Sequence, residues 1–532
     1  MSNLPVYSNT FADSKIKNML VKTYGCAVCG IDAIKITVEV NLVQGKKFYM
    51  VGLPDNAVKE SWFRIIAAAK NVGHRIPVKR TTINLAPADI KKEGSAYDLT
   101  IAIGMLAAAQ EIPDNKVGDY VIMGELALDG ILRPIKGALS IAFKAKEEGF
   151  KGVILPMSNI NEVAIVDGIE ILGAESLIDV IEFFNDKSKL ENFAKPITDF
   201  FQVNDCEYDI DFADVKGQEN VKRALEISAA GGHNVILIGP PGSGKSMLAK
   251  RMPTILPPLT VDEALETTKI HSVAGILAPG SGLVSARPFR SPHHTSSGAA
   301  LAGGGSNPKP GEISLAHNGI LFLDELPEFN REVLEVMRQP LEDRVVTISR
   351  ARATVDYPAG FMLVAAMNPS PSGEFYNPNE AHADTEFSVQ RYLNKISGPL
   401  MDRIDLHIEV NPVPYDKLAS KMPGEASKEI RTRVMAARLK QLNRYKEYPG
   451  IHNNAQMTPK LQEEHCKIDE KAQELLKTAM ERLGMSARSY GRIFKVARTI
   501  ADLGNDQLVG ANHIAEAIQY RTLDRDNWLT QS

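Results

Sequence analysis

The hydrophobic and polar positions over the first 184 residues follow two different periods. In residues 35–42, IKITVEVN, and again from residue 81, TTINLAPAD, apolar and polar side chains alternate, which is typical of a strand with one buried face. Residues 56–73, NAVKESWFRIIAAAKNVG, repeat apolar side chains at helical spacing and end at Gly73, a residue type that favours helix C-termini. Strands and helices in this mixture predict an α/β domain over residues 1–184.

Changes in composition mark two further boundaries. Residues 185–210 are polar and acidic, which predicts a linker between domains. A second α/β pattern covers residues 211–415, and residues 416–532, rich in Lys, Glu, Ala and Leu at helical spacing, predict an all-helical domain. Because 532 residues exceed one core at ~100–200 residues per domain, we expect three domains.

The composition, 44% hydrophobic and 24% charged residues, is that of an ordinary globular protein. A net charge of −4 excludes a general attraction to nucleic acid, so a nucleic-acid surface requires a local basic patch. The first twenty residues carry no apolar signal-peptide core, and the apolar run at residues 100–109 is shorter than the ~20 residues that span a bilayer. We therefore expect a cytoplasmic protein with no membrane partner.

A phosphate-binding pattern begins the second α/β block. An apolar strand at residues 235–238 leads into GPPGSGKS, and a helix follows. Glycines let backbone N–H groups surround phosphate oxygens, while Lys245 reaches the outer phosphates and the Ser246 hydroxyl ligates Mg²⁺. The expected ATP contacts are Gly239, Pro240, Pro241, Gly242, Ser243, Gly244, Lys245 and Ser246.

Two later strands supply polar side chains for the same site. In GILFLDELPEF an apolar strand ends in Asp324 and Glu325, which suits Mg²⁺ binding through water by Asp324 and general-base catalysis by Glu325. In FMLVAAMN a third strand ends in Asn368 and should lie beside the Asp324 strand in a parallel sheet. Since ligands bind at the carboxyl ends of such strands, the Asn368 amide is placed to sense the γ-phosphate.

Two arginines complete the candidate set. Arg403 in SGPLMDRIDLHIEV comes just before a strand, and Arg488 in GMSARSYGRIFKVARTIADL begins a helix. Phosphoryl transfer benefits from cations near the γ-phosphate, and a neighbouring subunit often supplies one. A solvated surface charge is the alternative for each arginine.

Motifs in this order resemble a AAA+ ATPase and, more narrowly, the magnesium-chelatase-like group called YifB or ComM. The similarity covers nearly the whole chain and is carried by GPPGSGKS, RPFRSPHHTSSGAALAGGG, PGEISLAHNGILFLDELPEF, SGPLMDRIDL and YGRIFKVARTIADL. It implies that Lys245 and Ser246 belong to Walker A and Asp324 and Glu325 to Walker B. Sensor 1 is then Asn368, the trans-acting arginine finger is Arg403, and sensor 2 is Arg488.

An arginine finger implies a homo-oligomeric ring, for which we expect a hexamer with ATP sites between subunits. Members of this group act as DNA motors, and ComM-type proteins are associated with branch migration during natural transformation. The resemblance therefore implies a DNA-dependent ATPase or helicase that uses ATP and Mg²⁺. Its DNA would be single-stranded or branched.

The N-terminal block resembles the proteolytic domain of Lon through KKEGSAYDLTIAIGMLAA and GELALDGILRPIKGALSIAFKAKEEGFKGVILP. Lon uses a Ser–Lys dyad, and Ser95 lies near its serine position. At the lysine position this chain has Leu139, which cannot accept a proton, and Lys136 lies three residues earlier in the predicted helix. We therefore expect a domain without peptidase activity that serves DNA binding or assembly.

Two inserted segments are candidates for DNA contact through phosphates. The first, VSARPFRSPHHTSSGAALAGGGSNPKPGE, reads as a flexible loop that carries Arg287, Arg290 and Lys309. The second, EDRVVTISRARATVDYP, predicts a β-hairpin with Arg350 and Arg352 near its turn. In related helicases a hairpin before sensor 1 enters the central pore.

The loop after Asn368 is where the chain departs from its relatives. Many relatives place four cysteines there, whereas this chain has Ser370, Ser372, His382 and Asp384 at the matching positions. Serines are poor zinc ligands, and one His with one Asp is too few for a closed site. We expect no zinc site.

Three functions are compatible with these patterns: an ATP-driven ring motor on DNA, a chelatase-like protein remodeller, and a Lon-like ATP-dependent protease. Leu139 argues against the protease. A fused Lon-like domain, absent from the chelatase subunit, argues against the remodeller.

Overall fold

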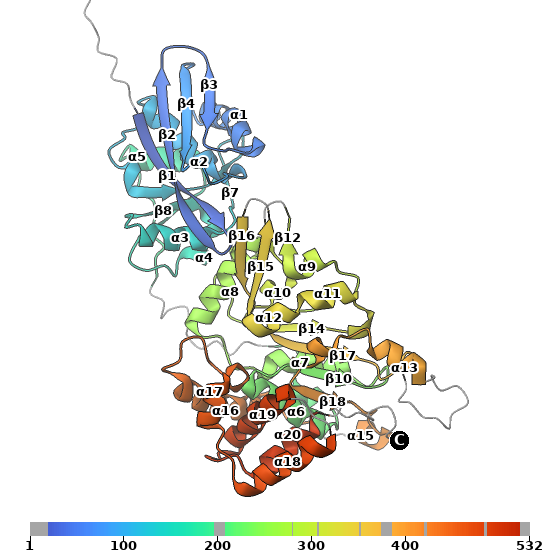
Figure 1. Cartoon of the computed structure of the whole chain (residues 1–532). Coiled ribbons are helices and arrows are strands. Elements are labelled where there is room, and N and C mark those ends of the chain that lie inside the picture. Colours follow the sequence, from blue (N-terminus) through green and yellow to red (C-terminus); the bar gives the residue numbers. More distant parts are fainter. Residues whose placement is uncertain are drawn as a thin grey trace, which may run out of the picture. The chain divides into compact units, whose positions relative to one another are not determined.

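The computed structural model describes residues 20–195, 208–278, 280–305, 308–350, 353–373, 386–419, 423–483 and 487–521. The chain divides into two compact units, which Figure 1 shows along the sequence from blue to red. The first unit comprises Met1–Phe200 with Gly275–Gly282, and the second comprises Phe201–Ala274 with Leu283–Ser532. Among the described residues, every helix is too short or too polar to cross a membrane.

The first unit is built on a seven-stranded mixed sheet in the order β3-β4-β2-β1-β5-β8-β9. Its strands are β1 (Leu20–Cys29), β2 (Asp32–Val43), β3 (Phe48–Val51), β4 (Arg80–Ala86), β5 (Tyr120–Ile122), β8 (Gly152–Pro156) and β9 (Glu170–Ala174). A separate short hairpin joins β6 (Glu125–Leu126) to β7 (Leu132–Arg133). The predicted strands at residues 35–42 and from residue 81 are confirmed as β2 and β4, which pair with each other antiparallel.

Helices of this unit are α1 (Asn56–Asn71), α2 (Asp98–Ala108), α3 (Ala138–Glu147), α4 (Ile160–Val163) and α5 (Leu177–Phe184). The predicted helix at residues 56–73 is α1, and Gly73 follows its end with a φ of +85°. Every residue of α2 is buried, because this helix packs on β1 and β2 and is covered by α1. A helix that is apolar all round is stable only in such a position.

The second unit contains a five-stranded sheet in the order β11-β14-β17-β10-β18, in which every pairing is parallel. Its strands are β10 (Val235–Ile238), β11 (Phe289–Arg290), β14 (Ile320–Leu323), β17 (Met362–Met367) and β18 (Leu406–Glu409). The predicted parallel pairing of the Asn368 strand with the Asp324 strand is confirmed. Because β10 lies between two strands that come later in the chain, its carboxyl end opens into the crevice where such sheets bind ligands.

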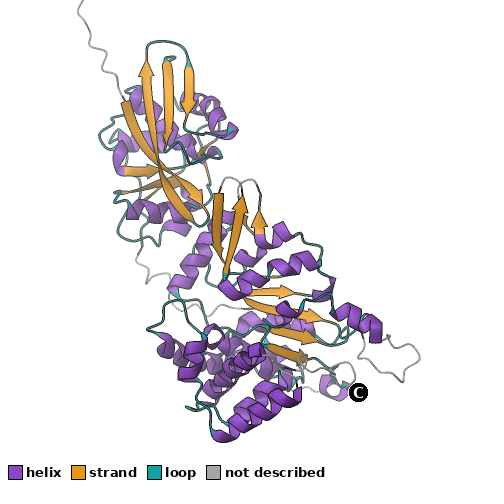
Figure 2. Ribbon diagram, viewed as in Figure 1, coloured by secondary structure: helices purple, strands orange, loops and turns teal. Residues whose placement is uncertain are grey.

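Helices and two hairpins surround this sheet (Figure 2). The helices are α6 (Glu219–Gly231), α7 (Lys245–Ile255), α8 (Val261–Ala274), α9 (Gly298–Ala302), α10 (Glu312–Leu315), α11 (Arg331–Val336), α12 (Arg338–Asp343), α13 (Glu386–Leu393), α14 (Gly398–Met401) and α15 (Tyr415–Ala419). One hairpin pairs β12 (Gly303–Gly304) with β13 (Lys309–Pro310), and the other pairs β15 (Val345–Arg350) with β16 (Ala353–Pro358).

The described residues from 427 onward are helical, as predicted, in α16 (Ser427–Tyr445), α17 (Pro459–His465), α18 (Glu470–Leu483), α19 (Ala487–Gly504) and α20 (Ala511–Gln519). Their apolar residues do not form a separate core. Leu237 of β10 and Val364 of β17 belong to the same buried cluster as Ile493 and Ala497 of α19. The predicted domain boundary at residue 415 therefore stays a prediction.

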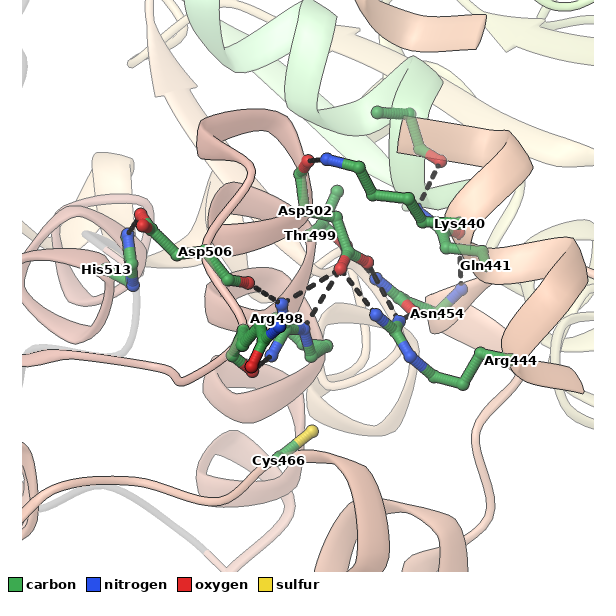
Figure 3. Close-up of polar contacts among 12 residues, drawn as sticks. Lys440, Gln441, Arg444, Asn454, Cys466, Arg498, Thr499, Asp502, Asp506 and His513 are labelled. Atoms are coloured by element: carbon green, nitrogen blue, oxygen red, sulfur yellow. Dashed lines mark hydrogen bonds and ion pairs between the residues drawn. The ribbon is translucent and has the colours of Figure 1, made fainter. Parts of the chain in front are cut away.

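A buried ion-pair cluster ties the C-terminal helices together (Figure 3). The Asp502 carboxylate in α19 accepts hydrogen bonds from Arg444 of α16, from Arg498 one turn earlier in α19, and from the Asn454 amide. The side chain of Asp502 is 1% exposed, so these donors replace water around a charge that burial alone would make costly. This cluster holds α16 and α19 in a defined relation.

Candidate nucleotide site

The loop between β10 and α7 curls back on the end of the sheet. The Gly239 N–H donates to Met367 O at 3.2 Å, and a Cβ on Gly239 would lie 2.1 Å from Val410 O. Only glycine fits at this close approach of two backbones. Gly244, at a φ of +94°, ends the loop and begins α7, so the loop N–H groups line the start of that helix, where anions bind favourably.

Lys245 lies inside this loop and is 8% exposed. Its Nζ donates to Gly239 O at 2.6 Å, to Pro240 O at 2.9 Å and to Asn368 Oδ1 at 3.2 Å. Burial lowers the pKa of Lys245, and the nearby Asp324 carboxylate opposes that shift. The structure thus brings the predicted lysine and the predicted sensor asparagine into direct contact.

Ser246 and Asp324 form a second contact of the site. The Ser246 hydroxyl donates to Asp324 Oδ2 at 2.6 Å across the carboxyl ends of β10 and β14. A hydroxyl and a carboxylate this close offer the hard oxygen ligands that Mg²⁺ takes beside nucleotide phosphates. The residues present therefore fit Mg²⁺, held by Ser246 and Asp324, and ATP, held by the loop 239–246. The metal would neutralise phosphate charge.

Glu325 follows Asp324 at the start of a short 3₁₀ helix, Leu326–Glu328. Its backbone adopts φ +52° and ψ +48°, a left-handed conformation that costs free energy in a residue other than glycine. The carboxylate is 58% exposed, and its Oε2 lies 3.2 Å from Nδ1 of His294. Glu325 and Asn368 also line a cavity of about 580 Å³ with Arg391, Tyr392 and Lys395 from the α13 region.

Tyr392 contacts the sensor from behind. The backbone N–H of Asn368 donates to the Tyr392 hydroxyl, and burial, which dominates over this bond, raises the pKa of Tyr392 to about 12. Sequence reasoning missed this tyrosine and the contact of His294 with Glu325. No pattern in the sequence pairs residues that are separated by tens of positions and lie in irregular segments.

Arg403 and Arg488 lie at the opposite end of the sheet from Lys245. Asp405 N donates to Asn234 O, just before β10, so the Arg403 segment lies beside the amino ends of β10 and β18. Lys245 lies beyond the carboxyl end of β10, and the four residues of this strand separate the two ends by roughly 13 Å. Neither arginine is therefore placed to contact the phosphates of its own subunit.

The two arginines are held close to each other by carboxylates. Arg488 Nη1 donates to Asp402 Oδ2 at 3.1 Å, and Arg403 donates to Glu342 and, through Nη1, to Pro399 O at 2.6 Å. Arg492, one turn further along α19, donates to Asp405. Helix α19 thus braces the Arg403 segment, and both candidate arginines share one edge of the subunit.

The DNA candidates of the first insert differ in their availability. The Arg287 guanidinium donates to Glu263 at 2.9 Å and to the carbonyls of Pro257 and Asn318 at 2.6 Å. Arg290 forms a bidentate pair with Glu312 at 2.6 and 2.7 Å. Because these donors are used inside the fold, neither side chain extends toward a ligand, and both stabilise the insert.

Lys309 and Arg350 are exposed on the two hairpins, while Arg352 lies outside the described residues. The hairpins lie side by side (Figure 1), because the Tyr357 hydroxyl donates to Pro308 O at 2.9 Å and Arg350 Nη2 lies 3.2 Å from where a Cβ of Gly304 would be. The first insert, predicted as a flexible loop, instead contains β11, α9 and β12. The two inserts thus form one basic, hairpin-tipped structure.

The loop after Asn368 begins as a compact turn. Ser370 and Ser372 are joined through their hydroxyls at 2.9 Å, and Gly373 lies against Pro241 of the phosphate loop. His382 and Asp384 lie outside the described residues. Among the residues that the structure describes, no three His, Cys, Asp or Glu side chains gather as metal ligands.

In the first unit, the residues compared with a Ser–Lys dyad have other contacts. The Ser95 hydroxyl donates to the Glu125 carboxylate. Leu139 is fully buried in α3, in a position that an amine would occupy only at a large desolvation cost. No titratable group therefore replaces the dyad lysine at Leu139.

A parallel sheet with this strand order, a phosphate loop on its central strand and polar residues at the ends of the two adjacent strands define a P-loop ATPase of the AAA+ class. Family models agree: residues 211–418 match "Magnesium chelatase, subunit ChlI", residues 38–159 match "Subunit ChlI of Mg-chelatase", and residues 424–521 match "Magnesium chelatase, subunit ChlI C-terminal". The chain belongs to this magnesium-chelatase-like family, in the group that contains YifB and ComM.

Relatives match over nearly full length. The chain is 45% identical to the uncharacterized protein YifB of Escherichia coli K12, over 94% of this chain and 96% of that protein. It is 43% identical to the competence protein ComM of Haemophilus influenzae, over 95% and 98%. Lon protease 2 of Bacillus subtilis is 31% identical over 159 residues, 26% of each chain, which agrees with the predicted Lon-like similarity.

Proposed function

We propose that this ATPase is a ring motor that translocates on or remodels DNA, as a helicase or branch-migration enzyme in recombination or natural transformation. The observation that carries the proposal is the pair of basic hairpins that projects from the inserts of the nucleotide-binding unit, with Lys309 and Arg350 exposed. The name of the 43% identical relative, a competence protein, supports the same direction.

At the nucleotide site, the proposed cofactors are ATP and Mg²⁺. The buried Lys245 amine and the Asn368 amide face the outer phosphates, and Ser246 with Asp324 holds the metal. Glu325 accepts a proton from the attacking water, a role for which an exposed carboxylate at a strand end is suited. Arg403 and Arg488, placed at the other end of the sheet, serve the site of a neighbouring subunit.

Such a division of residues requires a ring of identical subunits, and we propose a hexamer. In the ring each subunit supplies the phosphate loop of one site and the two arginines of the next. A cation on the γ-phosphate contributes strongly to phosphoryl transfer, so an isolated subunit should be nearly inactive.

DNA binding is proposed to run through the hairpins and to be independent of base sequence. Lys309, Arg350 and Arg352 suit contact with phosphates, and few aromatic side chains accompany them for base stacking. Binding should therefore weaken steeply with salt.

The second candidate function is a protein remodeller, which the descriptions of the three matching family models favour. The two functions differ in what stimulates ATP hydrolysis. A remodeller responds to a protein partner, whereas a DNA motor responds to DNA alone.

The deciding experiment measures ATP hydrolysis by the full chain with single-stranded, duplex and forked DNA, followed by strand displacement on a four-way junction. The double variant Lys309→Ala/Arg350→Ala should lose stimulation. Lys460→Ala/Arg482→Ala removes the same charge from exposed positions of α17 and α18 and should keep it. A wild-type protein with no DNA stimulation and no gel shift at low salt would sink the motor.

A further inference from the structure

His294 provides the printed contact of the general-base candidate, and it comes from the first insert rather than from the nucleotide core. His294 Nδ1 lies 3.2 Å from Glu325 Oε2. At this distance Nδ1 must carry a proton and donate it to the carboxylate, because two acceptors would repel. The bond thus exists with a neutral Nδ1–H imidazole as well as with the cation.

The imidazole is held in place by two other rings. The His293 ring lies over it with centroids 4.1 Å apart, and Phe329 meets it edge-on at 6.4 Å. Phe329 is 3% exposed and ends the 3₁₀ turn that Glu325 begins, so His294 packs on the same short element whose carboxylate it binds. Its ring is only 31% exposed. A side chain packed in this way holds Glu325 in one defined orientation.

From His294 the chain leads directly to the basic hairpins. Ser296 N donates to His293 O, Ser297 caps α9, and β12 follows at Gly303. The residues between His294 and the first hairpin are therefore an ordered turn and helix, which transmit displacement of the hairpin. The first hairpin in turn contacts the second through Pro308 and Tyr357.

The other members of the nucleotide site contact one another. Lys245 binds Asn368, and Ser246 binds Asp324, whereas Glu325 is bonded to a side chain of the insert. A carboxylate that already accepts a proton donor is a weaker base and is oriented toward that donor. Its left-handed backbone is a further sign that this orientation is imposed by its surroundings.

We propose that His294 is a positioning residue that restrains Glu325 until the hairpins engage their ligand. The proposal rests on the proposed function for the identity of that ligand, DNA. When DNA displaces the hairpins, α9 shifts the 293–297 turn, the bond from Nδ1 to Oε2 breaks, and Glu325 turns to the attacking water. DNA can drive this change only if it binds the released state more tightly than the restrained one.

The test compares ATP turnover of four full-length proteins without DNA. His294→Phe keeps a ring between His293 and Phe329 but removes the donor, and it should raise kcat several-fold at an unchanged KM for ATP. His294→Asn keeps a donor near the position of Nδ1 and should restore the wild-type rate. His293→Phe makes the same chemical change in the neighbouring ring and should remain within about two-fold of wild type.

A merely structural role of His294 would lower turnover in both His294 variants, whereas the restraint raises it in one of them only. Thermal unfolding of each variant checks that the fold is retained. A His294→Phe rate at or below that of wild type, or equal rates for His294→Phe and His294→Asn, would falsify the assignment. DNA stimulation of the wild type is measured separately, and its absence contradicts the proposed motor while the comparison without DNA still tests His294.

Discussion

The guanidinium of Arg488 donates to the carboxylate of Asp402 at 3.1 Å, which places it next to Arg403 and beside the amino ends of the parallel strands. Phosphates bind beyond the opposite ends. The two arginines therefore form one functional edge, and α19 fixes their spacing through the contacts of Arg488 and Arg492 with the Arg403 segment. This relationship makes the activity of one subunit depend on the next.

Mixing experiments should reveal this dependence. Arg403→Ala and Lys245→Ala each inactivate a different half of every site, and an arginine finger alone is worth about 10³–10⁵ in kcat. Because a mixed ring contains some junctions with an intact Lys245 facing an intact Arg403, an equimolar mixture should recover measurable ATP hydrolysis. Arg488→Ala should complement Lys245→Ala in the same way.

A mixture of Arg403→Ala with Arg488→Ala is the control. Its junctions always lack one arginine of the shared edge, so the mixture should stay less active than either mixture with Lys245→Ala. Recovery in all mixtures alike would place the arginines on separate sites.

Glu325→Gln separates binding from turnover. The amide keeps the size of the side chain but cannot accept the proton, so kcat should fall by about 10²–10⁴ while nucleotide affinity is retained. Fluorescent-nucleotide binding and ATP turnover measure the two quantities. Lys245→Ala should instead lose affinity, because its amine is the buried cation of the phosphate loop. Normal hydrolysis by Glu325→Gln would assign the base to another residue.

The stability of the helical region should depend on Asp502. Asp502→Ala leaves Arg444 and Arg498 buried without a carboxylate, and loss of one partner from a buried ion pair costs about 3–5 kcal/mol. Urea unfolding followed by circular dichroism should show the earlier transition. Asp506→Ala is the matched change in the same segment, where the carboxylate is 57% exposed and pairs with His513 at 3.1 Å (Figure 3), and it should cost about 0–1 kcal/mol.

Thiol labelling should distinguish the described cysteines. Burial raises the pKa of Cys26 and of Cys466 to about 12, so both stay as neutral thiols at pH 8 and are shielded from reagent. Cys29, at the other end of β1 from the solvent-excluded segment of Cys26, is exposed. Mass spectrometry after brief iodoacetamide treatment should find Cys29 modified before the other two, and equal labelling of Cys26 would contradict the burial of β1.

The ends of the sheet strands were predictable because period and position carry the information. Four consecutive apolar residues before GPPGSGKS and six before Asn368 identify buried parallel strands, and parallel strands must present their carboxyl ends together. The contact between Lys245 and Asn368 follows from that rule. The confirmed hairpin at β15 and β16 follows similarly from alternating side chains on either side of a short turn.

What the sequence could not predict are contacts between irregular segments. A basic pattern shows that Arg287 and Arg290 are cations, but Glu263 and Glu312, which engage them, are brought close only by tertiary packing. The bond between His294 and Glu325 arises in the same way. The wrong expectation of a flexible first insert has the same origin, because its short strands are held by the neighbouring hairpin and have little intrinsic preference.

The shared apolar cluster of the nucleotide-binding sheet and the C-terminal helices has a consequence for how the chain can be divided. Family models end one match at residue 418 and begin the next at residue 424, yet Leu237 and Ile493 are buried in a single cluster. A boundary between sequence families is therefore not a boundary between folding units here. Protease cleavage between the two regions should leave fragments that remain associated, and neither region expressed separately should reach the native state, since each would expose the face that the other covers.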